Sequence, residues 1–207
     1  MRSGLEVCDQ LRRARCCAYG SGVQVIVEVE VEAGTYVSEQ FQSRINAPSV
    51  CPNCGIAQSL EAHGYYWRWV SETLLGRILR IAVRRFFCRC CAVTVSCLPR
   101  FAQPYRVVCN ATIEVFFEGR TDRSDVRAWG ELLGRYRRAY QRWFGTLRME
   151  CGALFGRSPP EEKPLIFWGR IMGTCGGLAA ATGKLVGQLR ITLFGRYRCH
   201  QRRIFRA

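Results

Sequence analysis

Two Cys-x-x-Cys pairs constrain the fold of this chain more than any other feature of its sequence. Cys51 and Cys54 form the first pair, and Cys88 and Cys91 form the second. A Cys-x-x-Cys turn presents two thiolates to one ion, so two such turns complete a closed tetrahedral zinc site with Zn–S bonds of about 2.3 Å. We therefore predict one structural Zn2+ ion bound by these four cysteines.

Two other side chains could enter this ligand set. His63 could replace one cysteine, and Cys90 could replace a member of the second pair only by breaking the two-residue spacing. Gly55 after the first pair permits a tight turn whose amides point at sulfur, whereas Ala92 follows the second pair. The alternatives without a metal are free core thiols in a reducing cell or a disulfide pairing.

Three segments have the patterns of β-strands. Ala62–Val70 is aromatic and strand-prone, and Leu79–Arg84 alternates apolar residues with arginine and alanine. These two strands would carry the chain from the first cysteine pair to the second. Val23–Glu32 alternates valine with glutamate in its second half, which predicts a strand that pairs with this ribbon or covers one of its edges. A short helix is expected over Tyr36–Ile45.

Three helices are expected after a linker at Leu98–Arg106. The linker is indicated by its two prolines. The predicted helices are Ala111–Glu118 with Asn110 as N-cap, Val126–Leu133 with Ser124 as N-cap, and Tyr136–Arg148 after a break at Gly134–Arg135. Tyr136, Tyr140, Trp143, Phe144 and Leu147 give the last helix an apolar stripe. Short helices with a glycine break predict a helix-turn-helix, and the alternative is a plain amphipathic hairpin.

These patterns predict an α+β chain. Residues 1–47 would be a leader with the strand at 23–32, and residues 48–103 a zinc ribbon. Residues 104–157 would form the three-helix, helix-turn-helix-like domain, and residues 158–207 a basic C-terminal segment. A glycine- and alanine-rich helix over Ile171–Phe194 would make that segment a basic helical tail.

The charge balance points to a polyanionic partner. The chain has 31 Lys and Arg residues against 16 Asp and Glu, a formal net charge of +15. Nucleic acid is the first candidate partner for such an excess. Almost all of the positive charge is arginine, which suits bidentate contacts to phosphate and guanine. A GC-rich genome would explain arginine over lysine but not the excess of base over acid.

Nine side chains are the candidates for nucleic-acid contact. From the ribbon, arginines that could clamp the phosphate backbone are Arg80, Arg84, Arg85 and Arg89. From the third predicted helix, residues that lie off the apolar stripe are Arg135, Arg137, Arg138, Gln141 and Arg142. We expect the second group to contact bases and phosphates.

Composition argues against three other classes of protein. The 13 cysteines are odd in number and no signal peptide opens the chain, so we do not expect a secreted disulfide scaffold. We expect the protein to be located in a bacterial cytoplasm, close to the nucleoid. No apolar run reaches the length of a membrane span. Strand-transfer enzymes need converging carboxylates on two metal ions, and carboxylates are scarce beyond residue 106, so catalysis is not expected.

Residues 48–106 resemble the zinc-ribbon domain of insertion-sequence transposases and of short proteins from the same mobile elements. The resemblance rests on four motifs: Cys51-Pro52-x-Cys54-Gly55, His63-Gly64-x-Tyr66-x-Arg68, Arg85-Phe86-x-Cys88-x-x-Cys91-x-x-Thr94-x-Ser96, and Leu98-Pro99-x-Phe101-x-x-Pro104-Tyr105-Arg106. In that family the ribbon is a DNA-binding module that precedes a helix-turn-helix. The family's helix-turn-helix is also resembled by Val126–Leu133, Gly134 and Arg142-Trp143.

The resemblance implies a zinc-dependent protein that binds double-stranded DNA at the ends of a mobile element. It would act as an accessory to a separate transposase, or as the recognition part of one. The alternative is a zinc-ribbon adaptor for RNA, single-stranded nucleic acid or protein. In that case the arginines and Tyr65, Tyr66, Trp67 and Trp69 could stack on unpaired bases.

Overall fold

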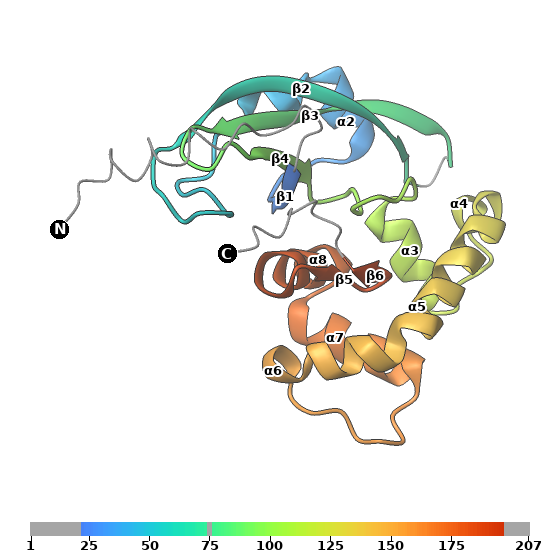
Figure 1. Ribbon diagram of the computed structural model, residues 1–207. Coiled ribbons are helices and arrows are strands. Elements are labelled where there is room, and N and C mark those ends of the chain that lie inside the picture. The colour runs from blue at the N-terminus through green and yellow to red at the C-terminus, as the bar shows by residue number, and fades with distance from the viewer. Residues whose placement is uncertain (1–21, 74–75, 197–207) are drawn as a thin grey trace.

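The computed structural model describes residues 22–73 and 76–196 as a four-stranded mixed sheet followed by helices (Figure 1). The strands are β1 (Gly22–Val27), β2 (Leu60–Ser71), β3 (Ile78–Cys88) and β4 (Thr94–Pro99), in the order β1-β4-β3-β2. β1 runs parallel to β4, and the other neighbours are antiparallel. The predicted α+β class is confirmed.

Most of the helices follow the sheet in the chain. α2 (Ala33–Ser38) lies between β1 and β2, and the helices after the sheet are α3 (Asn110–Phe117), α4 (Ser124–Ala128), α5 (Gly130–Glu150), α6 (Gly152–Phe155), α7 (Pro164–Cys175) and α8 (Leu178–Lys184). The shorter elements are the 3-10 turn η1 (Phe41–Arg44), the π-helical turn η2 (Leu185–Leu189) and the hairpin of β5 (Ile191–Thr192) and β6 (Gly195–Arg196). In Figure 1 the sheet lies above α3–α8, with α8 below β1. Within the described residues, no helix is both long and apolar enough to cross a membrane.

The two strands predicted between the cysteine pairs are confirmed as β2 and β3. They form an antiparallel pair with a register shift between Ala62 and Tyr65. Gly64 lies in this bulge with a φ of 81°, a left-handed conformation that glycine adopts without steric cost. Ile81 and Val83 on β3 are fully buried, as the apolar alternation predicts.

The N-terminal strand is shorter than predicted. β1 ends at Val27 rather than Glu32, and the chain then leads into α2. The predicted pairing with the ribbon is confirmed, because β1 lies parallel to β4 from Gly22 to Val27. The helix predicted over Tyr36–Ile45 is divided into α2 and η1.

The linker predicted at Leu98–Arg106 is wrong in its first part. Thr94–Pro99 forms β4, and all 6 of its residues are buried. β4 lies between β1 and β3, so both of its neighbours are strands. Val95 and Cys97 alternate with Thr94 and Ser96, so the sequence does carry a strand pattern here, and Pro99 is the last residue of the strand rather than part of a linker.

The helix break predicted at Gly134–Arg135 is wrong. α5 runs without interruption from Gly130 to Glu150. Leu133, Tyr136 and Tyr140 are buried on both sides of Gly134. Packing of this stripe outweighs the cost of a glycine inside a helix, which is about 1 kcal/mol. The predicted second helix, Val126–Leu133, is divided at Trp129 between α4 and the start of α5, and the predicted third helix lies in the rest of α5.

The two predicted N-caps are the first residues of their helices. The cap position lies one residue before Asn110 in α3 and one residue before Ser124 in α4. Asp125 lies in the first turn of α4, where it accepts hydrogen bonds from Arg123 and from the Thr112 hydroxyl at 2.6 Å. Burial would raise the pKa of this carboxyl, but the contacts with Arg123 and Thr112 lower it instead.

The single helix predicted over Ile171–Phe194 is several elements. α7 ends before Gly176 and Gly177, which have φ angles of 76° and 115°, and α8 starts at Leu178. Consecutive left-handed residues cannot continue a right-handed helix. The part of the predicted basic tail beyond Arg196 lies outside the described residues.

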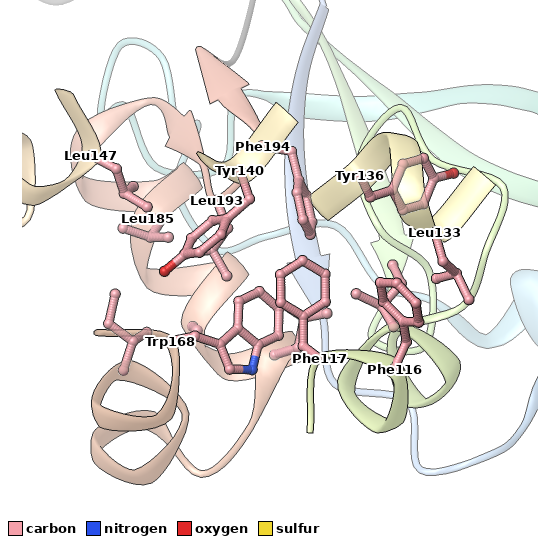
Figure 2. Close-up of a cluster of buried hydrophobic side chains, with 14 of the residues drawn as sticks. Phe116, Phe117, Leu133, Tyr136, Tyr140, Leu147, Trp168, Leu185, Leu193 and Phe194 are labelled. Atoms are coloured by element: carbon pink, nitrogen blue, oxygen red, sulfur yellow. The ribbon is translucent and has the colours of Figure 1, made fainter. Parts of the chain in front are cut away.

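One apolar core joins the helical elements (Figure 2). Buried residues from α3, α4, α5, α7, α8, η2 and the C-terminal hairpin belong to it. Phe117 of α3 stacks on Trp168 of α7 with ring centroids 4.0 Å apart, and Tyr140 of α5 meets the edge of the same indole. The segment predicted as a basic tail thus supplies part of this core, because α7 and α8 pack into it.

We expect Phe117→Ala to reduce the free energy of unfolding by about 3–5 kcal/mol, the usual cost of removing a buried phenyl ring. Phe117 is 5% exposed, whereas Met149 on α5 is 75% exposed. Met149→Ala is therefore the matched control and should change stability by less than about 0.5 kcal/mol. Chemical denaturation of both variants measures the difference. Equal stabilities would contradict this assignment of the core.

Candidate metal centre

Four thiols converge at one end of the sheet. The Sγ atoms of Cys51, Cys54, Cys88 and Cys91 all lie within 4.8 Å of one another. The Cys51–Cys91 and Cys54–Cys88 sulfur distances are both 3.7 Å. A tetrahedral ion with bonds of about 2.3 Å places its sulfurs about 3.8 Å apart. The cluster therefore has the dimensions to hold one metal ion.

The two cysteine turns have the same backbone geometry. The amide of Gly55 donates to the carbonyl of Cys51 at 2.8 Å, and the amide of Ala92 donates to the carbonyl of Cys88 at 2.9 Å. Gly55 has a φ of 74° and Ala92 a φ of 54°. Alanine thus adopts, in the second turn, the left-handed conformation that glycine adopts in the first. Such a conformation costs a non-glycine residue about 1–2 kcal/mol.

Two residues outside the Cys-x-x-Cys motifs hold these turns in place. Ser59 is buried, its hydroxyl lies 3.3 Å from the Cys88 sulfur, and its carbonyl accepts from the amide of Arg89. Arg190, at the end of η2, donates to the carbonyl of Pro52 at 2.8 Å. Sequence reasoning missed both, because serine and arginine carry no ligand spacing and Arg190 is remote in the chain.

The thiols in the cluster have different proton affinities. Burial would raise the pKa of Cys88, but hydrogen bonds with Ser59 and the nearby backbone amides lower it to about 6. Burial raises the pKa of Cys91 and of Cys54. A metal ion binds thiolates, so its binding would displace the protons that the raised pKa values retain.

Neither alternative ligand lies in the cluster. Cys90 packs beside it as a half-buried apolar residue. His63 is exposed, and its ring lies 5.6 Å from the ring of Phe87. The donor set is thus four thiols, which suits zinc among the common metal ions. Within the described residues, no other group of three or more His, Cys, Asp or Glu side chains could hold a metal ion.

The predicted ribbon arginines have different surroundings. The guanidinium carbon of Arg80 lies 4.9 Å from the ring of Trp67, and that of Arg84 lies 4.8 Å from the ring of Tyr65. Arg89 forms an ion pair with Glu61. Arg85 is half-buried and adjacent in β3 to Arg84, so these two side chains point to opposite faces of the sheet.

The predicted residues on α5 also divide into two groups. Arg137 is directed inward: it donates to the carbonyl of Phe116 at 3.0 Å and lies over the ring of that residue. Arg135 is exposed and forms an ion pair with Glu131, one turn earlier. Arg138, Gln141 and Arg142 are exposed, and within the part of the chain that the structure describes neither of the two arginines forms an ion pair.

We expect Cys54→Ser to lose the metal, because a hydroxyl is a poor replacement for a thiolate in a closed zinc site. Cys90→Ser is the matched control, since Cys90 is adjacent to the cluster but outside it. Native mass spectrometry of the purified proteins should show about one zinc per chain for the wild type and for Cys90→Ser. Full metal content in Cys54→Ser would contradict the assignment.

Ala92→Gly should stabilise the protein by about 1 kcal/mol, because glycine removes the strain of the left-handed conformation at this position. Gly55→Ala should destabilise it by a similar amount for the same reason. Thermal unfolding of both variants with metal bound measures the two shifts. Shifts of the same sign would mean that the two turns are not equivalent.

Residues 51–151 match the family model described as "Domain of unknown function (DUF6431)". The matched segment includes the cysteine cluster, strands β2, β3 and β4, and helices α3, α4 and α5. No curated protein and no solved structure matches the chain. The match identifies a shared domain of unknown function that includes all four cysteines of the cluster.

Proposed function

We propose that this protein is a zinc-stabilised DNA-binding protein whose α5 helix lies against duplex DNA. The observation that carries the proposal is the outer face of α5. There Arg138, Gln141 and Arg142 are exposed, and within the described residues neither arginine has an ion-pair partner. We call these three residues the α5 basic face.

The α5 basic face is fixed by the packing of the opposite side of the helix. Tyr136, Tyr140 and Leu147 are buried in the helical core. Residues 138 and 142 are four apart, so their side chains leave the helix on one face, and residue 141 lies beside them. A helix with two neighbouring guanidinium groups on its free face can enter the major groove, where arginine contacts guanine with two hydrogen bonds.

The structure narrows the set of α5 residues that could contact DNA. Arg137 already makes a hydrogen bond to Phe116 and lies over its ring, so its role is to attach α5 to α3. Arg135 would have to give up Glu131 before it could bind a phosphate. We therefore assign DNA contact to the α5 basic face and a structural role to Arg137.

The net charge supports a polyanion as the partner. A charge of +15 attracts phosphate over a range limited by ionic strength and does not by itself favour one sequence. Zinc would act only structurally, by holding the two cysteine turns together. A site closed by four thiolates has no open position for a substrate. We further propose that the target is the end of a mobile element and that a separate transposase is a partner, as the resemblance of residues 48–106 implies.

We expect Arg142→Gln to weaken duplex binding and to reduce the log–log salt slope by about 0.9, the value for one neutralised phosphate. If Arg142 instead contacts guanine, a binding-site selection should show lost preference at one base pair, worth about 1–3 kcal/mol. Arg142→Lys separates these roles, because it keeps the charge but not the bidentate geometry. Arg138→Gln tests the neighbouring position in the same way.

Arg44→Gln is the matched control for these variants. Arg44 lies on η1, is exposed, and is paired with Glu39 at 3.3 Å. Its substitution should leave the duplex affinity, salt slope and base preference unchanged. The proposal fails if Arg138→Gln and Arg142→Gln also leave all three unchanged while both variants remain folded.

A further inference from the structure

Three large aromatic side chains are exposed in a row on β2. Tyr65 is 41% exposed, Trp67 57% and Trp69 55%. They occupy alternate positions of one strand, so they project from the same face of the sheet. The residues between them are half-buried, and Val70 is fully buried. The exposed rings are therefore the outward face of a strand whose other face packs on the protein.

The neighbouring strand adds positive charge to this row. Tyr65 pairs with Arg84, Trp67 with Ala82, and Trp69 with Arg80. Paired residues share a sheet face, so the six side chains form one surface, which we call the aromatic face. The guanidinium carbon of Arg80 lies 4.9 Å from the centroid of the Trp67 ring, and none of the six carries a negative charge.

The position of the aromatic face leaves it accessible. Among the strands of the described residues, β2 lies at the edge of the sheet and pairs with β3 alone. Exposed aromatic residues on an edge strand favour association with other chains, and proteins normally avoid them. Three such residues in succession, next to two arginines, indicate that this surface has a binding partner.

We propose that the aromatic face binds single-stranded DNA by stacking unpaired bases on Trp67, Trp69 and Tyr65. Indole and phenol rings stack on the face of any base, and adjacent arginines bind the phosphates that connect the bases. Alternate residues of a strand are about 6.8 Å apart, so the three rings extend over about 14 Å. Consecutive bases of an extended single strand can occupy such a row.

The charge and shape of the aromatic face favour this partner over two others. Base pairs in a duplex are stacked on one another, so their faces cannot reach rings that project from a sheet. An apolar protein surface would bury the rings favourably, but it would also remove the charges of Arg80 and Arg84 from water without an opposite charge. That desolvation costs free energy. The choice of DNA over RNA rests on the proposed function of α5. The two surfaces together would suit a boundary between duplex and unpaired strand.

The test uses the full-length, zinc-loaded protein and a short fluorescently labelled oligothymidylate, with binding measured by anisotropy. Trp67→Ala should raise the dissociation constant roughly tenfold, since one stacked base contributes on the order of 1–3 kcal/mol. Trp67→Phe should stay close to the wild type because it keeps a ring. Arg80→Gln should weaken binding and make the salt slope shallower by about 0.7, the single-strand value for one phosphate.

Two controls separate this site from the rest of the protein. Ile166→Ala removes a side chain of α7 that is 61% exposed, and it should leave oligothymidylate binding unchanged. Trp67→Ala should bind a blunt duplex as the wild type does, whereas Arg142→Gln should lose duplex affinity and keep single-strand affinity. Failure of the α5 proposal would thus appear only with the duplex, and failure of this one only with the single strand.

Three results would overturn the inference. The first is that both Trp67→Ala and Trp69→Ala keep the wild-type single-strand affinity. The second is that these variants lose as much duplex affinity as single-strand affinity. The third is tighter binding of an oligouridylate RNA of the same length than of the DNA, which would overturn the assignment to DNA. Near-ultraviolet circular dichroism of each variant checks that the fold is retained.

Discussion

The position of the second cysteine turn is the constraint on which the sheet depends. This turn connects the end of β3 at Cys88 to the start of β4 at Thr94, and the first turn leads into β2. The apolar cluster around the thiols has few members besides cysteine, with Val95 as its buried aliphatic residue. Burying one such side chain contributes about 1.5–3 kcal/mol, whereas binding of a structural zinc contributes about 10–16 kcal/mol. A metal ion would therefore be the dominant source of order at this end of the sheet.

The sequence was informative where a residue pattern has a local physical cause. The Cys-x-x-Cys spacing identified the four clustered thiols, and alternation over Leu79–Arg84 identified β3. It was uninformative where the cause is tertiary. In β4 the polar Thr94 and Ser96 are as buried as Val95 and Cys97, and Arg190 reaches Pro52 from the far end of the chain. The sequence around Ala92 also gives no sign of its left-handed backbone. That conformation becomes understandable only when the turn at Ala92 is compared with the equivalent turn at Gly55.

The predictions for glycine were wrong in opposite directions at two places: Gly134 was predicted to break a helix, and Gly176 and Gly177 were predicted to lie inside one. At Gly134 the helix continues, because the apolar stripe of α5 is buried before and after it. At Gly176 and Gly177 the helix ends, because both residues adopt left-handed angles and the chain turns into α8. A side chain at position 177 would approach the carboxylate of Glu114, which also accepts from the amide of Leu178. Tertiary packing therefore decides which glycine ends a helix, and the local sequence alone does not.

Arginine in this chain has two structurally different uses, and the distinction decides which residues can bind a partner. Arg137 and Arg170 donate to carbonyls of other helices and hold helices together, and Arg123 donates to Asp125 at the start of its own helix. Arg80 and Arg84 lie over aromatic rings on β2, where the flat surface of each guanidinium is covered by a ring. Net charge counts both kinds equally. The arginines that remain for the DNA binding that we propose therefore lie on two small surfaces, one on α5 and one on the sheet.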